Sequence, residues 1–236
     1  MNCCEENHYQ PKLVCNKGNM LLHEIKIPYT IEKAYNLQFE IKNLNMNKVN
    51  IELLITNQIY ELLEKVNEEL IENIYILNTP NNQDTDICIV FKQIAKEVGI
   101  KKKYILFRST KYLNKLNNSI TYYNKDLIYE GKDLISNYLT SINLDNDKYE
   151  SLLFNFGKTV ITLSNEVTIP REINNIDIID IIDDKFIDDK FIDVKFSIDF
   201  KIATTDDLPI YMNNLIGLMF KKMFYNVKLF IDKLNS

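Results

Sequence analysis

The sequence has few of the residues on which common nucleotide-binding and nucleophilic sites depend. It contains 5 glycines in 236 residues, too widely spaced to form a P-loop or a dinucleotide-binding fingerprint: Gly18, Gly99, Gly131, Gly157 and Gly217. It contains 2 histidines, His8 and His23, so a Ser-His or Cys-His nucleophile would have to draw on the amino-terminal segment. The chain therefore shows no complete catalytic site.

Long apolar runs and a disulfide framework are also missing. No stretch approaches the roughly 18 consecutive apolar residues of a membrane span, and the amino terminus lacks the basic and apolar segments of a secretory signal. Of the 4 cysteines, Cys3, Cys4 and Cys15 crowd one end, and Cys88 lies in an apolar pattern with no evident partner. We therefore expect an intracellular protein in a reducing compartment.

Acidic residues outnumber basic ones, with 33 Asp and Glu against 28 Lys and Arg. The net charge of −5 argues against nucleic acid as the main partner, because nonspecific binding to a phosphate polymer needs clustered Lys and Arg. One basic stretch, interleaved with aromatic residues, is a candidate contact for a single strand: Lys101, Lys102, Lys103 and Arg108. The alternative, which we favour, is a strand with one solvated face followed by a lysine-bearing loop.

Two groups of residues could be offered as metal ligands. The first is a set of thiols and imidazoles, Cys3, Cys4, His8, Cys15 and His23, whose spacing matches no common zinc site. The second is a set of aspartates that could hold Mg²⁺ but that is more typical of a solvated edge: Asp177, Asp180, Asp183, Asp184, Asp188 and Asp189. We expect no metal and no cofactor in this chain.

Hydrophobic periodicity predicts alternating strands and helices. Strands are expected at residues 22–27, 37–41, 49–55, 73–77, 103–107, 119–123 and 127–129, and a hairpin joins 160–163 to 167–169. Helices are expected at residues 58–71, 85–98 and 133–139. The second of these is predicted from Ile87, Val90, Phe91, Ile94 and Val98, with Gly99 as a stop.

The carboxyl-terminal region has the clearest pattern. Apolar and polar residues alternate over 192–202, after a pentapeptide repeat over 183–196, and predict a strand with one buried face. A helix is expected over 208–234, apolar around much of its girth, so that one side covers its own sheet and the other meets a partner. The predicted dimerisation residues are Leu208, Met212, Leu215, Met219, Met223, Val227, Phe230 and Leu234, with Leu62 and Val66 of the first helix.

Taken in order, these elements resemble the α-type assembly subunit of multisubunit DNA-dependent RNA polymerases, the family of the third-largest eukaryotic subunit and the archaeal D subunit. Residues 49–55 and 58–71 resemble its first strand and helix, residues 84–100 its acidic turn and Gly-ending helix, and residues 194–234 its final strand and helix. The first helix lacks the family's Asn-x-x-Arg-Arg signature, and residues 140–190 match poorly.

The resemblance implies an α+β fold of two interleaved subdomains, with a mixed sheet and a long carboxyl-terminal dimerisation helix. Residues 1–20 would be a loose arm, 21–72 plus 190–236 the dimerisation subdomain, and 73–189 an inserted β-rich subdomain. The chain would be a noncatalytic scaffold in a nucleotidyltransferase complex. Its partners would be a second α-like subunit or a second copy and the large polymerase subunits, with DNA and RNA bound only through the complex.

The abundance of Asn, Ile, Lys and Asp is typical of an AT-rich genome, which fits a plastid stroma as well as a cytoplasm. Two other functions stay open. One is a structural or host-interaction protein of an AT-rich virus or parasite. The other is a diverged metal-dependent nucleic-acid-processing enzyme that uses Asp183 and Asp184.

Overall fold

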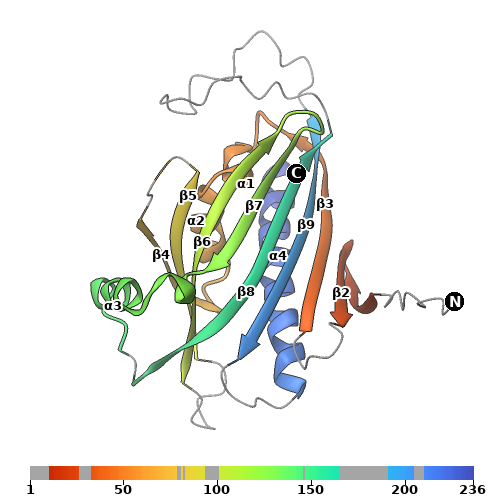
Figure 1. Ribbon diagram of the computed structural model, residues 1–236. Coiled ribbons are helices and arrows are strands. Elements are labelled where there is room, and N and C mark those ends of the chain that lie inside the picture. Colours follow the sequence, from red (N-terminus) through yellow and green to blue (C-terminus); the bar gives the residue numbers. More distant parts are fainter. Residues whose placement is uncertain are drawn as a thin grey trace, which may run out of the picture.

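The computed structural model is built on one nine-stranded sheet (Figure 1). It describes residues 11–26, 33–78, 81, 83–93, 101–145, 147–164, 191–204 and 210–236. The strands are β1 (Lys12–Lys17), β2 (Met20–Lys26), β3 (Lys33–Asn45), β4 (Ile71–Asn78), β5 (Asp84–Phe91), β6 (Lys102–Asn114), β7 (Ser119–Asp126), β8 (Tyr149–Leu163) and β9 (Phe191–Thr204). The helices are α1 (Glu52–Ile55), α2 (Gln58–Val66), the 3₁₀ helix η2 (Leu127–Glu130), α3 (Lys132–Ser141) and α4 (Ile210–Asn235).

The order of the strands places β3, from the amino-terminal part of the chain, next to β9, from the carboxyl-terminal part. It runs β1-β2-β3-β9-β8-β7-β6-β5-β4, and adjacent strands in this order are antiparallel. A short parallel pairing of β6 with β8, Lys102 opposite Tyr149, forms at the end of the sheet that β7 does not reach. Because β9 lies between β3 and β8, all strands share one sheet, and the prediction of two interleaved subdomains around a mixed sheet is wrong.

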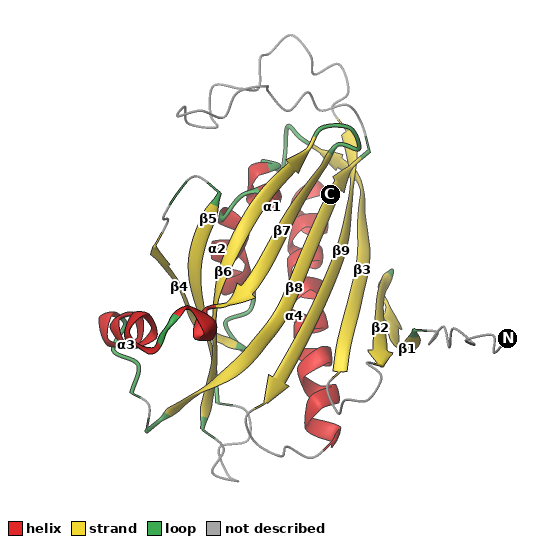
Figure 2. Ribbon diagram, in the orientation of Figure 1, coloured by secondary structure: helices red, strands yellow, loops and turns green. Residues whose placement is uncertain are grey.

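Helices α1, α2 and α4 pack on one face of this sheet (Figure 2). Helix α4 packs on β2, β3 and β9, and its inward residues Met223, Val227 and Ile231 are 1%, 0% and 0% exposed. Under the helix, Phe39 of β3 stacks on Phe196 of β9 with ring centroids 4.5 Å apart. Burial of this apolar layer is the main favourable contribution to folding, at about 25 cal/mol per Å².

Helix α3 covers the opposite face of the sheet near the β4 edge. Alternate residues of β5 and β6 supply the two sides, so that Ile87 and Ile89 join the main core while Cys88 and Val90 pack with α3 residues such as Leu139. Burial raises the pKa of the Cys88 thiol to about 12. Strand β5 is consequently buried on both sides.

Burial on both faces explains why the helix predicted over 85–98 is wrong in its first half. The run Ile87-Cys88-Ile89-Val90-Phe91 is apolar at every position, and its spacing fits a helix face and a doubly buried strand equally well. Its β-branched residues form β5, and residues 94–100 lie outside the described residues.

The strand predicted over 49–55 is also wrong. Leu54 N donates to Ile51 O over 2.9 Å and Ile55 N to the same oxygen over 3.2 Å, which gives the helical turn α1. The Asn50 side chain accepts from Glu52 N over 2.9 Å and so satisfies one amide at the start of that turn.

The strand predicted over 127–129 is wrong, because these residues form the 3₁₀ helix η2, and residues 12–17 of the predicted loose arm form β1. The predictions nearer the carboxyl terminus agree better. The alternating segment 192–202 lies in β9, the helix over 208–234 corresponds to α4, and the helix over 133–139 corresponds to α3. Residues 1–10 of the predicted arm, the second half of the 160–169 hairpin and the pentapeptide repeat as far as residue 190 lie outside the described residues. In the part of the chain that is described, no helix combines the length and apolar character needed to cross a membrane.

Candidate functional site

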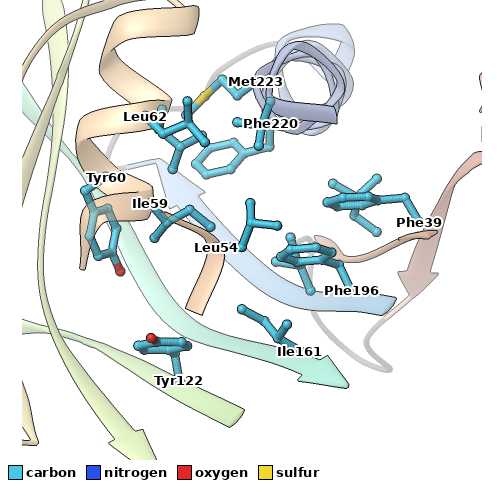
Figure 3. Packing of buried hydrophobic residues seen from close by; sticks show 14 of the residues in the cluster. Phe39, Leu54, Ile59, Tyr60, Leu62, Tyr122, Ile161, Phe196, Phe220 and Met223 are labelled. Atoms are coloured by element: carbon cyan, nitrogen blue, oxygen red, sulfur yellow. The ribbon is translucent and has the colours of Figure 1, made fainter. Parts of the chain in front are cut away.

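An apolar cavity lies between the sheet and the helices that cover it. Its volume is about 70 Å³. Its walls come from α2, α4 and five strands: Ile59, Tyr60, Leu63, Ile89, Ile105, Phe107, Tyr122, Asn124, Thr159, Ile161, Ile198, Phe200, Phe220, Met223 and Phe224. Figure 3 shows this convergence, with Ile59 and Tyr60 from α2 and Phe220 and Met223 from α4 facing Tyr122 and Ile161 of the sheet.

The strand pleat decides which residues reach the cavity. Side chains alternate between the two faces of a strand, so Tyr122 and Asn124 of β7 point inward while Tyr123 between them is exposed. In β8, Thr159 and Ile161 line the cavity, and Val160 lines a hollow on the outer face. That outer hollow, about 360 Å³, is bordered by polar residues such as Gln38, Glu40 and Lys195, so it offers an apolar molecule less cover.

Two tyrosines contribute hydroxyl groups next to the cavity, and both hydroxyls have partners. Tyr60 Oη donates to Ser109 Oγ over 3.4 Å, and Tyr122 Oη donates to the Ile55 carbonyl oxygen. Burial raises the pKa of Tyr60 to about 12 and also raises the pKa of Tyr122, because the phenolate would lose its hydration. Both side chains are therefore neutral at physiological pH.

Asn124 differs from the tyrosines. Its side-chain oxygen Oδ1 is buried and has no hydrogen-bond partner among the described residues. The neighbouring residue across β8 is Gly157, which has no side chain to fill the space beside Asn124. On the other side, Asn124 pairs with Ser109 of β6, so the polar end of the cavity is made by adjacent strands.

The chemistry of the cavity suits binding better than catalysis. Each lining residue is uncharged, so the site offers dispersion contacts, two tyrosine rings and one free acceptor. Within the described part of the chain, no cluster of three or more His, Cys, Asp or Glu side chains could hold a metal ion. Of the residues considered as zinc ligands, Cys15 of β1 accepts from Lys221 Nζ over 3.0 Å, and His23 lies in β2. Cys3, Cys4, His8 and the six aspartates lie outside the described residues.

The structure places several of the predicted dimerisation residues against the chain's own core. Met219, Met223, Val227 and Leu62 are buried there, and Val66 and Phe230 pack at its edge. Leu215 and Leu234 are 40% and 41% exposed. Leu208 and the side chain of Met212 lie outside the described residues. Contact of these residues with a second copy stays a prediction that a single chain does not test.

The predicted basic contact consists mainly of ion-paired side chains. Lys102 Nζ lies 2.6 Å from Glu72 Oε2, Lys103 pairs with Glu150, and Arg108 Nε lies 2.7 Å from Asp86 Oδ1. Asp86 is fully buried and also accepts from Tyr138 Oη over 2.7 Å. Lys101 is exposed next to this group. The structure brings Lys102, Lys103 and Arg108 onto β6 but pairs each with a carboxylate, so the nucleic-acid contact stays an untested prediction.

Sequence reasoning missed the cavity. Its residues are spread from position 59 to position 224, and most have the same apolar character as residues of a filled core. The one local signal is Asn124, a polar residue at an inward position between Tyr122 and Asp126. That position could be recognised as inward only after the register of β7 was known.

Comparison with known proteins concerns the fold. No protein-family model matches the sequence, and no curated protein matches it. Among solved structures, the human StarD13 (DLC2) lipid transfer and protein localization domain superposes with a TM-score of 0.58, at 9% identity, over 96% of this chain and 89% of that one. Human STARD10 gives 0.59 at 7% identity over 94% and 73%, and a STAR-related lipid transfer protein from Xanthomonas axonopodis gives 0.54 at 8% over 94% and 98%.

These likenesses establish the fold and correct the family interpretation. The resemblance to an RNA polymerase α-type subunit is wrong, and with it the scaffold function, the transcription assignment and the polymerase partners. The two alternative functions have no support from the comparisons either. The order of strands and helices along the chain misled because it does not show which strands pair. The chain has the fold of StAR-related lipid transfer domains, a large antiparallel sheet held against a carboxyl-terminal helix.

Proposed function

We propose that this chain binds a single lipid-class molecule in the space between the sheet and helix α4. The observation that carries the proposal is the cavity itself, enclosed by α2, α4 and the sheet and lined almost wholly by apolar side chains. Burial of an apolar chain or ring there would release water from both surfaces, at about 25 cal/mol per Å². The proteins of similar fold whose names describe lipid transfer support the same chemistry.

The cavity of about 70 Å³ is smaller than the roughly 300–1,000 Å³ of typical small-molecule sites. A lipid would therefore have to displace side chains or the covering helices as it enters. Phe220, Met223 and Phe224 of α4 form much of that cover, and Met side chains repack at low cost. In this proposal the structure corresponds to a closed form that opens when the ligand enters.

The direct test is to purify the chain and examine what it carries. Native mass spectrometry followed by solvent extraction should find one lipid-class molecule per chain, either co-purified or taken up from vesicles that contain a mixture of neutral lipids and phospholipids. A chain that stays empty after both treatments would contradict the proposal.

A pair of adjacent substitutions separates the cavity from the rest of the surface. Thr159→Phe places a ring in the cavity, whereas Val160→Phe places the same ring on the outer face of β8. We expect Thr159→Phe to lower lipid uptake at least about tenfold by occupying the site, and Val160→Phe to leave it unchanged. Equal uptake by both variants would place the ligand elsewhere.

A further inference from the structure

The side-chain oxygen of Asn124, a buried acceptor without a partner among the described residues, makes this residue a candidate to bind a polar group of the ligand. A buried acceptor without a partner carries a desolvation cost that a core residue normally avoids. Among the described residues, Asn124 Oδ1 is the one buried side-chain atom in this condition. The other polar groups around it are satisfied: Ser109 by Tyr60, and Tyr122 by the Ile55 carbonyl.

The register of the sheet sets a glycine beside Asn124. Gly157 stands directly across from Asn124, and Phe200 of β9 stands beyond Gly157. Because Gly157 has no side chain, no β8 side chain stands between Asn124 and Phe200 at this register, and both of these residues line the cavity. A hydroxyl or N–H group on an otherwise apolar molecule fits that arrangement, because it would donate to Oδ1 while its carbon skeleton covers the ring.

Charge argues against an ionised ligand group. Each residue that lines the cavity is uncharged. Asp86 and Arg108, which pair across β5 and β6, pack with Tyr138 of α3 on the other face of the sheet. Lys111 of β6 stands opposite Tyr122 in the register but is not among the lining residues. A carboxylate or phosphate brought into this space would lose its hydration without gaining a cationic partner among those residues. A neutral donor has no such penalty.

From this geometry we infer that the ligand is a neutral lipid that carries a hydroxyl or amide N–H group, and that Asn124 Oδ1 accepts a hydrogen bond from that group. The inference rests on the proposed function and narrows it. It states which polar group the ligand carries and which residue binds that group. Asn124 determines specificity here, and the apolar walls supply the affinity.

The test compares three probes of equal chain length on the wild-type protein by titration calorimetry: 1-decanol, its methyl ether and decanoate. The ether keeps the oxygen but has no donor, and decanoate is ionised at about pH 8. We expect the alcohol to bind about tenfold more tightly than the ether, as one hydrogen bond to an otherwise unpaired acceptor allows, and decanoate to bind most weakly.

The variant Asn124→Leu, which removes the acceptor at similar volume, should bind the alcohol and the ether equally. Thr121→Val, an outward position on the same strand, should keep the wild-type preference. If none of the probes binds the wild type, the proposed function fails. If the ether or decanoate binds as well as the alcohol, the function stands and the role of Asn124 is overturned.

Discussion

Two asparagines, Asn67 and Asn124, differ in the hydrogen bonds that their side-chain amides make. Asn67 is fully buried, and its Nδ2 donates to Leu63 O over 2.8 Å and to Met223 O over 3.2 Å, while its Oδ1 accepts from Asn226 over 2.9 Å. Asn124 Oδ1 has no such partner among the described residues. The same substitution should therefore have opposite effects at the two sites.

We expect Asn67→Leu to lower the free energy of unfolding by about 3 kcal/mol, because the hydrogen bonds of its side chain with Leu63 O, Met223 O and Asn226 Nδ2 are lost. Asn124→Leu should raise it by about 1 kcal/mol, because an unsatisfied group is replaced by an apolar one. Urea unfolding of the two variants and the wild type measures both values. A loss of stability at both sites would mean that Asn124 is satisfied in solution.

Tyr60 links stability to alkaline pH. Burial raises its pKa to about 12, against about 10 in an unfolded chain. Between these values the unfolded chain has lost a proton that the folded chain retains, so stability falls as the pH rises. At pH 11 this single group should remove about 1.4 kcal/mol.

The check is the difference in free energy of unfolding between wild type and Tyr60→Phe, which should shift by about that amount, in favour of the variant, from about pH 8 to about pH 11. Phe107→Leu is the control, since Phe107 packs beside Tyr60 but does not titrate. A difference that stays constant with pH would show that Tyr60 ionises normally in the folded chain.

At the scale of the elements, Gly217 lets helix α4 approach the sheet. A Cβ atom at this position would stand 2.8 Å from Tyr35 Cε1, and Tyr35 is 2% exposed, so its ring has little room to move. Alanine favours a helix over glycine by about 1 kcal/mol, whereas overpacking a core costs about 1–3 kcal/mol. The cost of the steric overlap should therefore exceed the gain in helix propensity.

Gly217→Ala is thus expected to destabilise the protein by about 1 kcal/mol in urea unfolding. In a Tyr35→Leu background, where the ring is absent, the same change should become neutral or stabilising, because only the helix preference is left. An equal loss in both backgrounds would assign the cost to something other than the contact of α4 with Tyr35.

Elements with one buried face were predictable, and elements covered on two faces were not. In β9, Val194, Phe196 and Ile198 alternate with polar residues because solvent reaches the other face, and that contrast is visible in the sequence. In β5 both faces are covered, by the main core and by α3, so the contrast disappears and helix and strand spacings both fit. The apolar girth of α4 raised the expectation of a partner although Met223 and Val227 are buried by the chain itself.

At the scale of the whole molecule, the pairing of distant strands creates the site. Leu37 of β3 lies opposite Ile198 of β9, and this long-range register has no local signal in the sequence. Individual strands could therefore be predicted while the single sheet could not. The cavity forms only when five strands and two helices have come together, so hydrophobic pattern and residue spacing could not predict the site.

The packing of the helices on this sheet would also control how the proposed ligand enters the cavity. The carboxyl end of α4 is held to the carboxyl end of β3, since Asn45 N donates to Asn235 Oδ1 over 2.7 Å and Asn235 Nδ2 donates to Asn43 O over 3.0 Å. With a cavity of about 70 Å³, binding must wait for the layer of α2 and α4 to move away from the strands. A process that waits for opening has a rate that levels off at high ligand concentration.

We expect stopped-flow uptake of 1-decanol to show such a plateau, followed by tyrosine fluorescence, which the 14 tyrosines and the absence of tryptophan make usable. Asn235→Ala removes the two hydrogen bonds of the Asn235 side chain to β3 without touching a cavity residue, so it should raise the plateau rate severalfold and leave the alcohol preference intact. Asn114→Ala, exposed at the end of β6, is the matched control and should not change the rate. A rate that grows in proportion to ligand concentration throughout would mean that the cavity is reached without displacement of the helix.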